Sequence, residues 1–346
     1  MNFIQILDTF FIAAVISYLL TPFVRVVAIK LNYLDHPKDN KVHAHPTPLL
    51  GGLSIVTGFT IALFTKSKIM ELTSVQAMLL GVFILLAIGL IDDKMGMMPN
   101  FKLLGQFLAA MVVIKSGLVV GFTGNYYLSV IVTYIWIIGI TNSFNLLDNM
   151  NGLSAGIAGI SAIFFGIIAY INGQPIITAI ALALAGASLG FLKHNFPKAS
   201  LFMGDSGSLV LGYVLSVLGI MSGLKIQVFT TAVCVPILVL GYPIFDTALV
   251  SIVRILEKRS IFQGGKDHSS HRIALLGLKR YKAVLAIYVI CIFLGIMAIT
   301  VTKVNFIVGL VITFFSCVSM LGLGIRLSFV DTKSFGRKKG TNGLSQ

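Results

Sequence analysis

Apolar runs of about 15–25 residues recur from one end of this chain to the other and restrict its fold more than any other feature. A helix of about 20 apolar residues crosses the hydrocarbon core of a bilayer, where every backbone polar group must be paired within the segment. We identify eleven such runs, at 4–29, 50–65, 74–91, 102–120, 126–142, 154–171, 175–192, 207–222, 227–253, 281–301 and 303–325. The pattern predicts an all-α, polytopic integral membrane protein with ten or eleven transmembrane helices.

Two details of these runs refine the prediction. The ninth run, 227–253, contains Pro236 and Pro243. Proline inside a helix removes a backbone hydrogen bond, so we expect this span to be broken. The first run has no basic segment before it and no small-residue cleavage site after it, so we interpret it as a retained span and not as a signal peptide.

The distribution of Lys and Arg predicts the orientation. With the N-terminus outside, 21 of the 26 basic residues fall on the cytoplasmic side, which agrees with the positive-inside rule and places the C-terminus in the cytoplasm. The net charge of +14 therefore indicates membrane topology and contact with anionic lipids. We expect no nucleic-acid partner, because no basic segment with interleaved aromatic residues is present. The expected location is the plasma (inner) membrane.

Polar residues concentrate in five segments, all on the predicted cytoplasmic side, whereas the outer loops are short and chemically plain. The five segments are LDHPKDNKVHAHPTPLLGG (34–52), GLIDDKMGMMPNFK (89–102), TNSFNLLDNMNGLSAG (141–156), KHNFPKASLFMGDSGSLVLG (193–212) and RILEKRSIFQGGKDHSSHRIALLGLKRY (254–281). A chain that is 57% hydrophobic tolerates such groups only where they leave the lipid or line a site. We therefore expect one site assembled from five cytoplasmic segments.

Three carboxylates stand out in these segments. Asp92 and Asp93 end an apolar run, and two adjacent carboxylates repel each other unless a cation lies near them. Asp205 lies between glycines just before another run, where it can be an ordinary helix N-cap or part of a helix N-terminus that binds an anion. Carboxylates and phosphates together are typical of Mg²⁺ sites. The alternative for the aspartate pair is a simple helix end in a solvated loop.

The asparagines and histidines allow two interpretations each. Asn142, Asn145 and Asn149 would share one face of a continuing helix, where amides either bind a metal or nucleobase or only join helices. His268 and His271 lie in a strongly basic loop, where they contact phosphate or protonate a leaving group, or are ordinary surface residues. Asp246 is the one acid well inside a predicted span, and we expect it to support the wall of the site.

In combination these motifs resemble the polyprenyl-phosphate N-acetylhexosamine-1-phosphate transferases, in particular the bacterial undecaprenyl-phosphate GlcNAc-1-phosphate transferase-like branch. The resemblance covers about residues 35 to 300, with five motifs in family order. They are VHAHPTPLLGG, LIDDKMG, NSFNLLDNMNGLSAG, FMGDSGSLVLG and DHSSHR. The resemblance implies transfer of a sugar-1-phosphate, most simply GlcNAc-1-phosphate, from a UDP-N-acetylhexosamine to undecaprenyl phosphate. UMP is released, and the product starts lipid-linked cell-envelope glycan synthesis.

The resemblance also implies roles for individual residues. The implied catalytic residues are Asp92, Asp93, Asp205, His268 and His271. A Mg²⁺ ion, with Mn²⁺ as an alternative, is expected on Asp205 and Asn145. The UDP-sugar is expected on Asp148, Asn151, Lys41 and Arg272. Residues 1–325 would form a single transmembrane catalytic domain and 326–346 a basic cytoplasmic tail; dimers occur in the family, so a homodimer is also open.

The motifs depart from the family pattern in three places. Asn151 stands where many relatives have Asp, and Asn149 where many have Gly. The histidine loop reads HSSHR, without the middle His of the GlcNAc-type pattern. It also lacks the consecutive histidines of the muramyl-pentapeptide branch, which disfavours that donor and leaves another UDP-amino sugar as the alternative.

Three other functions compete with this interpretation. A membrane transporter would place ionisable groups near the bilayer midplane and repeat its two halves, whereas here the charges gather at one face without a repeat. A CDP-alcohol phosphotransferase would carry a D-G-x2-A-R motif, which this chain lacks. A scaffold without catalytic activity would not need Asp92, Asp93 and Asp205 together.

Overall fold

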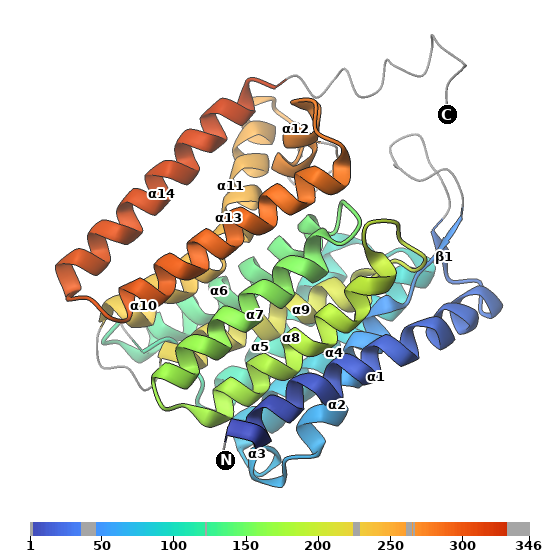
Figure 1. Ribbon diagram of the computed structural model, residues 1–346, viewed down its shortest axis with the longest axis horizontal. Coiled ribbons are helices and arrows are strands. Elements are labelled where there is room, and N and C mark those ends of the chain that lie inside the picture. The colour runs from blue at the N-terminus through green and yellow to red at the C-terminus, as the bar shows by residue number, and fades with distance from the viewer. Residues whose placement is uncertain are drawn as a thin grey trace.

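The computed structural model describes residues 3–35, 46–121, 123–223, 229–260, 265 and 267–330, which are almost entirely helical (Figure 1). The helices are α1 (Phe3–Lys30), α2 (Gly51–Phe64), α3 (Ser67–Met70), α4 (Thr73–Met95), α5 (Pro99–Lys115), α6 (Tyr126–Leu147), α7 (Leu153–Ile171), α8 (Pro175–Asn195), α9 (Asp205–Gly223), α10 (Phe229–Val239), α11 (Gly241–Leu256), α12 (Ser269–Leu275), α13 (Arg280–Val301) and α14 (Phe306–Ser328). Two short strands, β1 (Leu34–Asp35) and β2 (Thr47–Pro48), pair antiparallel. Each of the eleven predicted apolar runs therefore contains helix in its described part.

The lengths of these helices refine the predicted number of spans. Among the described residues, eight helices are long and apolar enough to cross a membrane: α1, α4, α6, α7, α8, α9, α13 and α14. The pair α10 and α11 adds a ninth span with a bend of 73°. The break lies at Leu240, between Pro236 and Pro243, so the predicted broken ninth span is confirmed. The other two predicted runs are the shorter helices α2, of 14 residues, and α5, of 17 residues.

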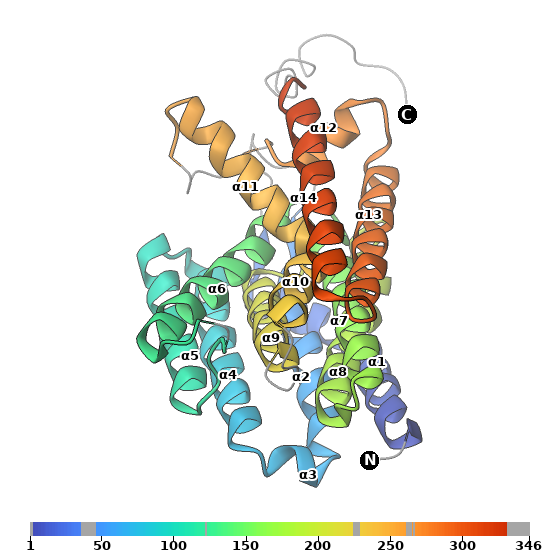
Figure 2. The ribbon, with the colours of Figure 1, turned by 90° about the vertical axis from the view of Figure 1, so that its left-hand side faces the viewer.

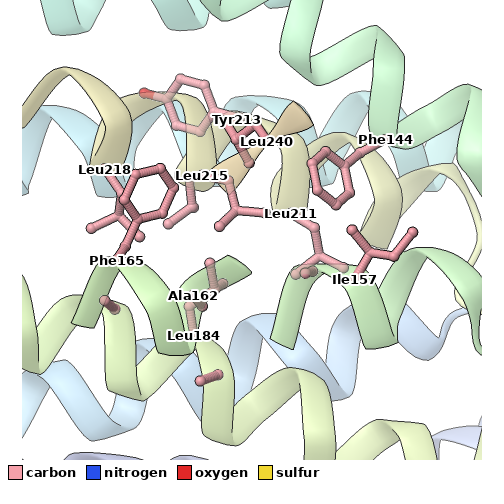
Figure 3. Packing of buried hydrophobic residues seen from close by; sticks show 14 of the residues in the cluster. Phe144, Ile157, Ala162, Phe165, Leu184, Leu211, Tyr213, Leu215, Leu218 and Leu240 are labelled. Carbon is pink, nitrogen blue, oxygen red and sulfur yellow. The ribbon is translucent and has the colours of Figure 1, made fainter. Parts of the chain in front are cut away.

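Helix α9 forms the centre of the molecule. It packs against α4, α6, α7 and α2, and its side chains are almost completely buried. Figure 3 shows Leu211, Leu215 and Leu218 of α9 facing Phe165 of α7 and, across the core, Leu184 of α8. In contrast, α14 lies at the edge of the molecule (Figure 1). Most of its apolar side chains are exposed. Figure 2 shows the same helices from the side. Exposed apolar faces of this length are expected to contact lipid.

Small residues let α9 approach its neighbours closely. A Cβ atom added at Gly89 of α4 would overlap the Cα and N atoms of Ser206, and one at Gly52 of α2 would overlap the backbone of Gly207. Both neighbours belong to the first turn of α9, which carries Asp205. The glycines therefore fix the position of that turn relative to α2 and α4.

Replacing Gly89 by Ala is expected to destabilise the protein by about 1–3 kcal/mol, because backbone atoms of α9 would have to move to admit the methyl group. The measurement is thermal unfolding of purified protein in detergent. Gly139→Ala is the matched control, since a Cβ atom there meets no heavy atom within 4 Å. Equal stability of the two variants would contradict the close approach of α4 and α9.

Candidate active site

All five polar segments reach a single cavity of about 1350 Å³ at one end of the helices. Asp35 and Thr47 represent the first segment, Asp93 the second and Asp148 the third. The fourth segment contributes most of the residues from Pro197 to Asp205, and the fifth contributes its cavity-lining residues Gly265, His271, Lys279, Arg280 and Tyr281. The first and fourth segments are joined by backbone bonds, in which Gly51 N donates to Phe202 O and Phe202 N to Pro48 O. The structure thus brings together the segments that the sequence analysis grouped.

The carboxylate of Asp93 caps helix α9. Its Oδ1 accepts a hydrogen bond from the backbone N–H of Asp205 at 2.7 Å, and its Oδ2 accepts one from Ser206 at 3.2 Å. Gly204 has φ +76°, and a side chain there would overlap the Asp93 carboxylate. We predicted that this helix start could bind a substrate anion; that prediction is wrong for these two amides, because the protein's own carboxylate already accepts both hydrogen bonds.

Lys102 joins the other two carboxylates. Its Nζ atom lies 3.0 Å from Asp92 Oδ2 and 2.7 Å from Asp205 Oδ2. Asp92 also accepts a hydrogen bond from the backbone N–H of Met97 at 2.5 Å. The sequence analysis counted Lys102 only as a marker of orientation. Its position ten residues after Asp92, across the turn at Gly96, was the available signal, since a turn of this length returns α5 to the end of α4.

The cluster also contains an amide. Asn145 Nδ2 donates a hydrogen bond to Ser208 Oγ at 3.0 Å, and the same side chain lies beside the carboxylate of Asp205. Among the described residues, no three His, Cys, Asp or Glu side chains converge as a metal-binding set. Two carboxylates and an amide, with Lys102 between the carboxylates, nevertheless fit Mg²⁺, which takes one or two carboxylates and fills its shell with water and substrate phosphates.

Asp148 follows the last residue of α6 and lines the cavity. Burial and the nearby carboxylates of Asp205 and Asp93 raise the pKa of Asp148 to about 8. At pH 7 this carboxyl group is mostly protonated, so it can donate a hydrogen bond as well as accept one. A group with both capacities suits the edge of a uracil ring.

The three asparagines that we expected on one helical face have different surroundings in the structure. Asn142 exchanges two hydrogen bonds with Gln106 of α5, at 2.6 and 3.2 Å, so the helix-joining alternative holds there. Asn145 joins the carboxylates. Asn149 lies beyond α6, which ends at Leu147, and therefore does not continue the helical face as we expected. It lines the cavity and accepts a hydrogen bond from Ser270 Oγ at 2.7 Å.

Asn151 and Gly152 form a turn between α6 and α7. Gly152 has φ +78°, its N–H donates to Asn195 Oδ1 at 2.6 Å, and its carbonyl accepts from Tyr288 Oη at 2.6 Å. Asn151 lines the cavity, and its amide lies 3.5 Å from the carbonyl of Pro197. The loop that carries Asp148 is therefore held from both sides.

The two predicted histidines have different surroundings. His271 lines the cavity, whereas His268 is buried with Nδ1 2.8 Å from Asp246 Oδ2. Arg272 does not line the cavity in the described part of the chain; its guanidinium donates to the backbone carbonyls of Leu327, Ser328 and Val330 at the end of α14. The structure thus gives Arg272 a structural partner in place of the predicted substrate. Lys41 lies outside the described residues.

Four other basic residues line the cavity and were not predicted as site residues: Arg25, Lys198, Lys279 and Arg280. They come from α1, the segment before α9 and the start of α13. The sequence analysis counted them only toward the orientation. Their meeting around one cavity depends on tertiary structure, and they supply positive charge to the cavity that also holds the carboxylate cluster, as phosphate-bearing substrates require.

Sequence comparison with known proteins finds relatives that act on polyprenyl phosphates. Residues 75–223 match the family described as glycosyl transferase family 4. The chain is 35% identical over 326 residues to the probable undecaprenyl-phosphate N-acetylglucosaminyl 1-phosphate transferase of Bacillus subtilis, covering 92% of this chain and 90% of the relative. It is 32% identical to the decaprenyl-phosphate N-acetylglucosaminephosphotransferase of Mycolicibacterium smegmatis, covering 83% and 79%. It is 34% identical to the phospho-N-acetylmuramoyl-pentapeptide-transferase of Moorella thermoacetica, covering 63% and 76%.

Proposed function

Because the chain belongs to the polyprenyl-phosphate hexosamine-1-phosphate transferase family, we propose that it transfers GlcNAc-1-phosphate from UDP-GlcNAc to undecaprenyl phosphate. The observation that carries the proposal is the cavity, which joins an acidic cluster and four basic side chains at one end of the membrane helices. Such a site can hold a charged, water-soluble donor beside the head group of a lipid acceptor. The distribution of Lys and Arg supports a cytoplasmic position for this end.

The proposed reaction is a phosphoryl transfer. An oxygen of the lipid phosphate forms a bond to the β-phosphorus of the UDP-sugar, and the bond from that phosphorus to the bridging oxygen breaks, so UMP leaves with the oxygen. A phosphate monoester has a second pKa near ~6 and is mostly ionised at neutral pH, so the attacking oxygen needs no strong base. The protein's main tasks are then positioning and neutralising charge.

The residues of the cavity suit these tasks. The carboxyl group of Asp148 and the amide of Asn151 would contact the nucleoside, and His271 and the four basic residues would contact phosphate oxygens; all of them line the cavity. Asp93 holds the first turn of α9, and thereby the Asp205 side chain, in place. Lys41 is part of the proposed donor site on sequence grounds alone.

A Mg²⁺ ion would be held by Asp205 and Asn145, with Asp92 close by, and Mn²⁺ is the alternative. When bound, the ion neutralises negative charge on the phosphates of the substrates. Lys102 lies between Asp92 and Asp205 and neutralises part of their negative charge. A second cation in this cluster would have to share the carboxylates with Lys102.

Removing divalent cations is expected to abolish transfer, because the carboxylates and the substrate phosphates then repel one another. The test is the transfer rate after dialysis against EDTA and again after adding Mg²⁺, Mn²⁺ or Ca²⁺. Mg²⁺ should restore the rate fully and Mn²⁺ partly. Full activity in EDTA would contradict the metal site and leave Lys102 as the cation of the cluster.

The proposed function is tested by transfer with purified protein in detergent, undecaprenyl phosphate, Mg²⁺ and a panel of donors. The panel holds UDP-GlcNAc, UDP-GalNAc and UDP-MurNAc-pentapeptide, and both UMP and lipid-linked product are followed. We expect UDP-GlcNAc to give both products. Reaction of another UDP-amino sugar alone would keep the reaction class and replace the donor. No reaction in folded protein would overturn the proposal and favour a transporter.

A further inference from the structure

Six consecutive polar residues are buried at the start of the short helix α12. Each is at most 3% exposed. They are Asp267, His268, Ser269, Ser270, His271 and Arg272. Burying polar groups costs free energy unless each one is hydrogen-bonded, so the partners of this segment decide how it is held.

The start of α12 is bound by Asp246 of α11. Asp246 is fully buried, and its Oδ1 accepts hydrogen bonds from the backbone N–H of Ser269 at 2.7 Å and from Ser269 Oγ at 2.5 Å. Its Oδ2 lies 2.8 Å from His268 Nδ1. The hydroxyl of Tyr242, one turn earlier on α11, contacts Ser269 Oγ at 2.7 Å. One carboxylate therefore contacts the residue before α12, the first backbone amide of α12 and a side chain.

The bend at Leu240 makes this contact available. It turns α11 by 73° from α10, and Asp246 follows within the first two turns of α11. Figure 2 shows α11 turning away from α10 and extending toward the end of the molecule where α12 lies. A straight ninth helix would carry Asp246 along the direction of α10, away from α12.

The other residues of the segment are held by other parts of the chain. Arg254 binds Asp267 through two hydrogen bonds, at 2.8 and 2.9 Å. Burial alone would raise the pKa of Asp267, but the hydrogen bonds and charge of Arg254 hold it well below its usual range. Ser270 binds Asn149 in the Asp148 loop, and Arg272 binds the end of α14. Of the six residues, His271 is the one that lines the cavity.

We propose that Asp246 is a positioning residue that holds α12, through His268 and Ser269, so that His271 stays in the wall of the cavity. His271 follows His268 by three residues, about one helical turn, so a shift at the start of α12 is passed directly to the His271 side chain. The inference rests on the proposed function in that it assigns His271 to the transfer site. It gives His268 a supporting role, different from the direct role that the sequence analysis predicted.

The test compares Asp246→Asn with the matched control Thr247→Val. Asparagine keeps the size of the side chain and one acceptor oxygen but loses the charge that faces His268. Thr247 is the next residue on α11, and its hydroxyl has no hydrogen-bond partner among the described residues. We expect Asp246→Asn to lower kcat about 10- to 100-fold with little change in the KM for UDP-GlcNAc, as for a slightly misplaced catalytic group, and Thr247→Val to change neither.

A double-mutant cycle with His271→Ala shows whether Asp246 acts through His271. If it does, Asp246→Asn has no further effect once His271 is absent. The same fold loss in both backgrounds, or an equal loss in Thr247→Val, would overturn the inference. Equal thermal unfolding temperatures of the two α11 variants would show that the loss is not one of folding.

Amide hydrogen exchange gives a second readout that needs no turnover. We expect the backbone amides of 269–275 to exchange at least about 10-fold faster in Asp246→Asn than in Thr247→Val, since the anchor of the first turn is weakened. Unchanged exchange would overturn the positioning role even if activity fell. If the wild-type protein transfers no donor, the proposed function fails, and exchange alone decides whether Asp246 holds α12.

Discussion

Replacing Asp205 by Asn is expected to lower the rate of sugar-1-phosphate transfer about 10²- to 10³-fold without unfolding the protein. The carboxylate contacts Lys102 at 2.7 Å and lies beside Asp92 and Asn145, so it stands at the centre of the acidic cluster. Asparagine preserves its shape and can still accept a hydrogen bond from Lys102. The negative charge is lost, and with it the main attraction for a divalent cation. Single-turnover transfer at several Mg²⁺ concentrations measures both effects.

Asp8→Asn is the matched control for this substitution. Asp8 forms an ion pair with Lys66 at 2.6 Å, close to the N-terminus and α3, at the end of the helices opposite α12 (Figure 1). The same chemical change there should leave transfer unchanged, since neither residue lines the cavity. A full transfer rate in Asp205→Asn, or an equal loss in Asp8→Asn, would contradict the central place of Asp205 in the site.

Replacing Asp93 by Ala is expected to reduce transfer by at least about 100-fold and to cost about 0.5–2 kcal/mol of stability. Both oxygens of Asp93 accept backbone hydrogen bonds from the first turn of α9, so the alanine variant leaves two buried N–H groups without their acceptor. The turn that carries Asp205 is then free to shift. Transfer kinetics and thermal unfolding in detergent measure the two losses.

Asp93→Asn separates positioning from proton transfer. Its one amide oxygen can still accept from the Asp205 N–H, so a positioning role predicts at least about 10-fold more activity in Asp93→Asn than in Asp93→Ala. If Asp93 took a proton from the lipid phosphate, both variants would be equally inactive, because neither side chain is a base. Equal inactivity would therefore overturn the role that the hydrogen bonds to α9 indicate.

The candidate site shows which site residues can be predicted from residue types alone and which cannot. Asp148, Asn151 and His271 line the cavity, and Asp205 and Asn145 lie together, while their predicted roles stay predictions. Two other residues of the same motifs contact protein groups in the structure, although we predicted that they bind substrate or act in catalysis. Arg272 binds the end of α14, and His268 binds Asp246. A motif shows that polar groups are needed near one place, but it does not show which of them faces the cavity and which holds its neighbour.

The sequence by itself determined the apolar helices, including the broken ninth span, and the grouping of five polar segments at one end. The physical reason is that the length of an apolar run and the position of a proline are local properties, and the thickness and dryness of a bilayer convert them directly into helices. Only the tertiary structure decided that Lys102 bridges Asp92 and Asp205, that Asp93 caps α9 and that Asp246 anchors α12. Those contacts join residues on different helices, and they depend on close approaches such as that of Gly89 to Ser206, which no local pattern encodes.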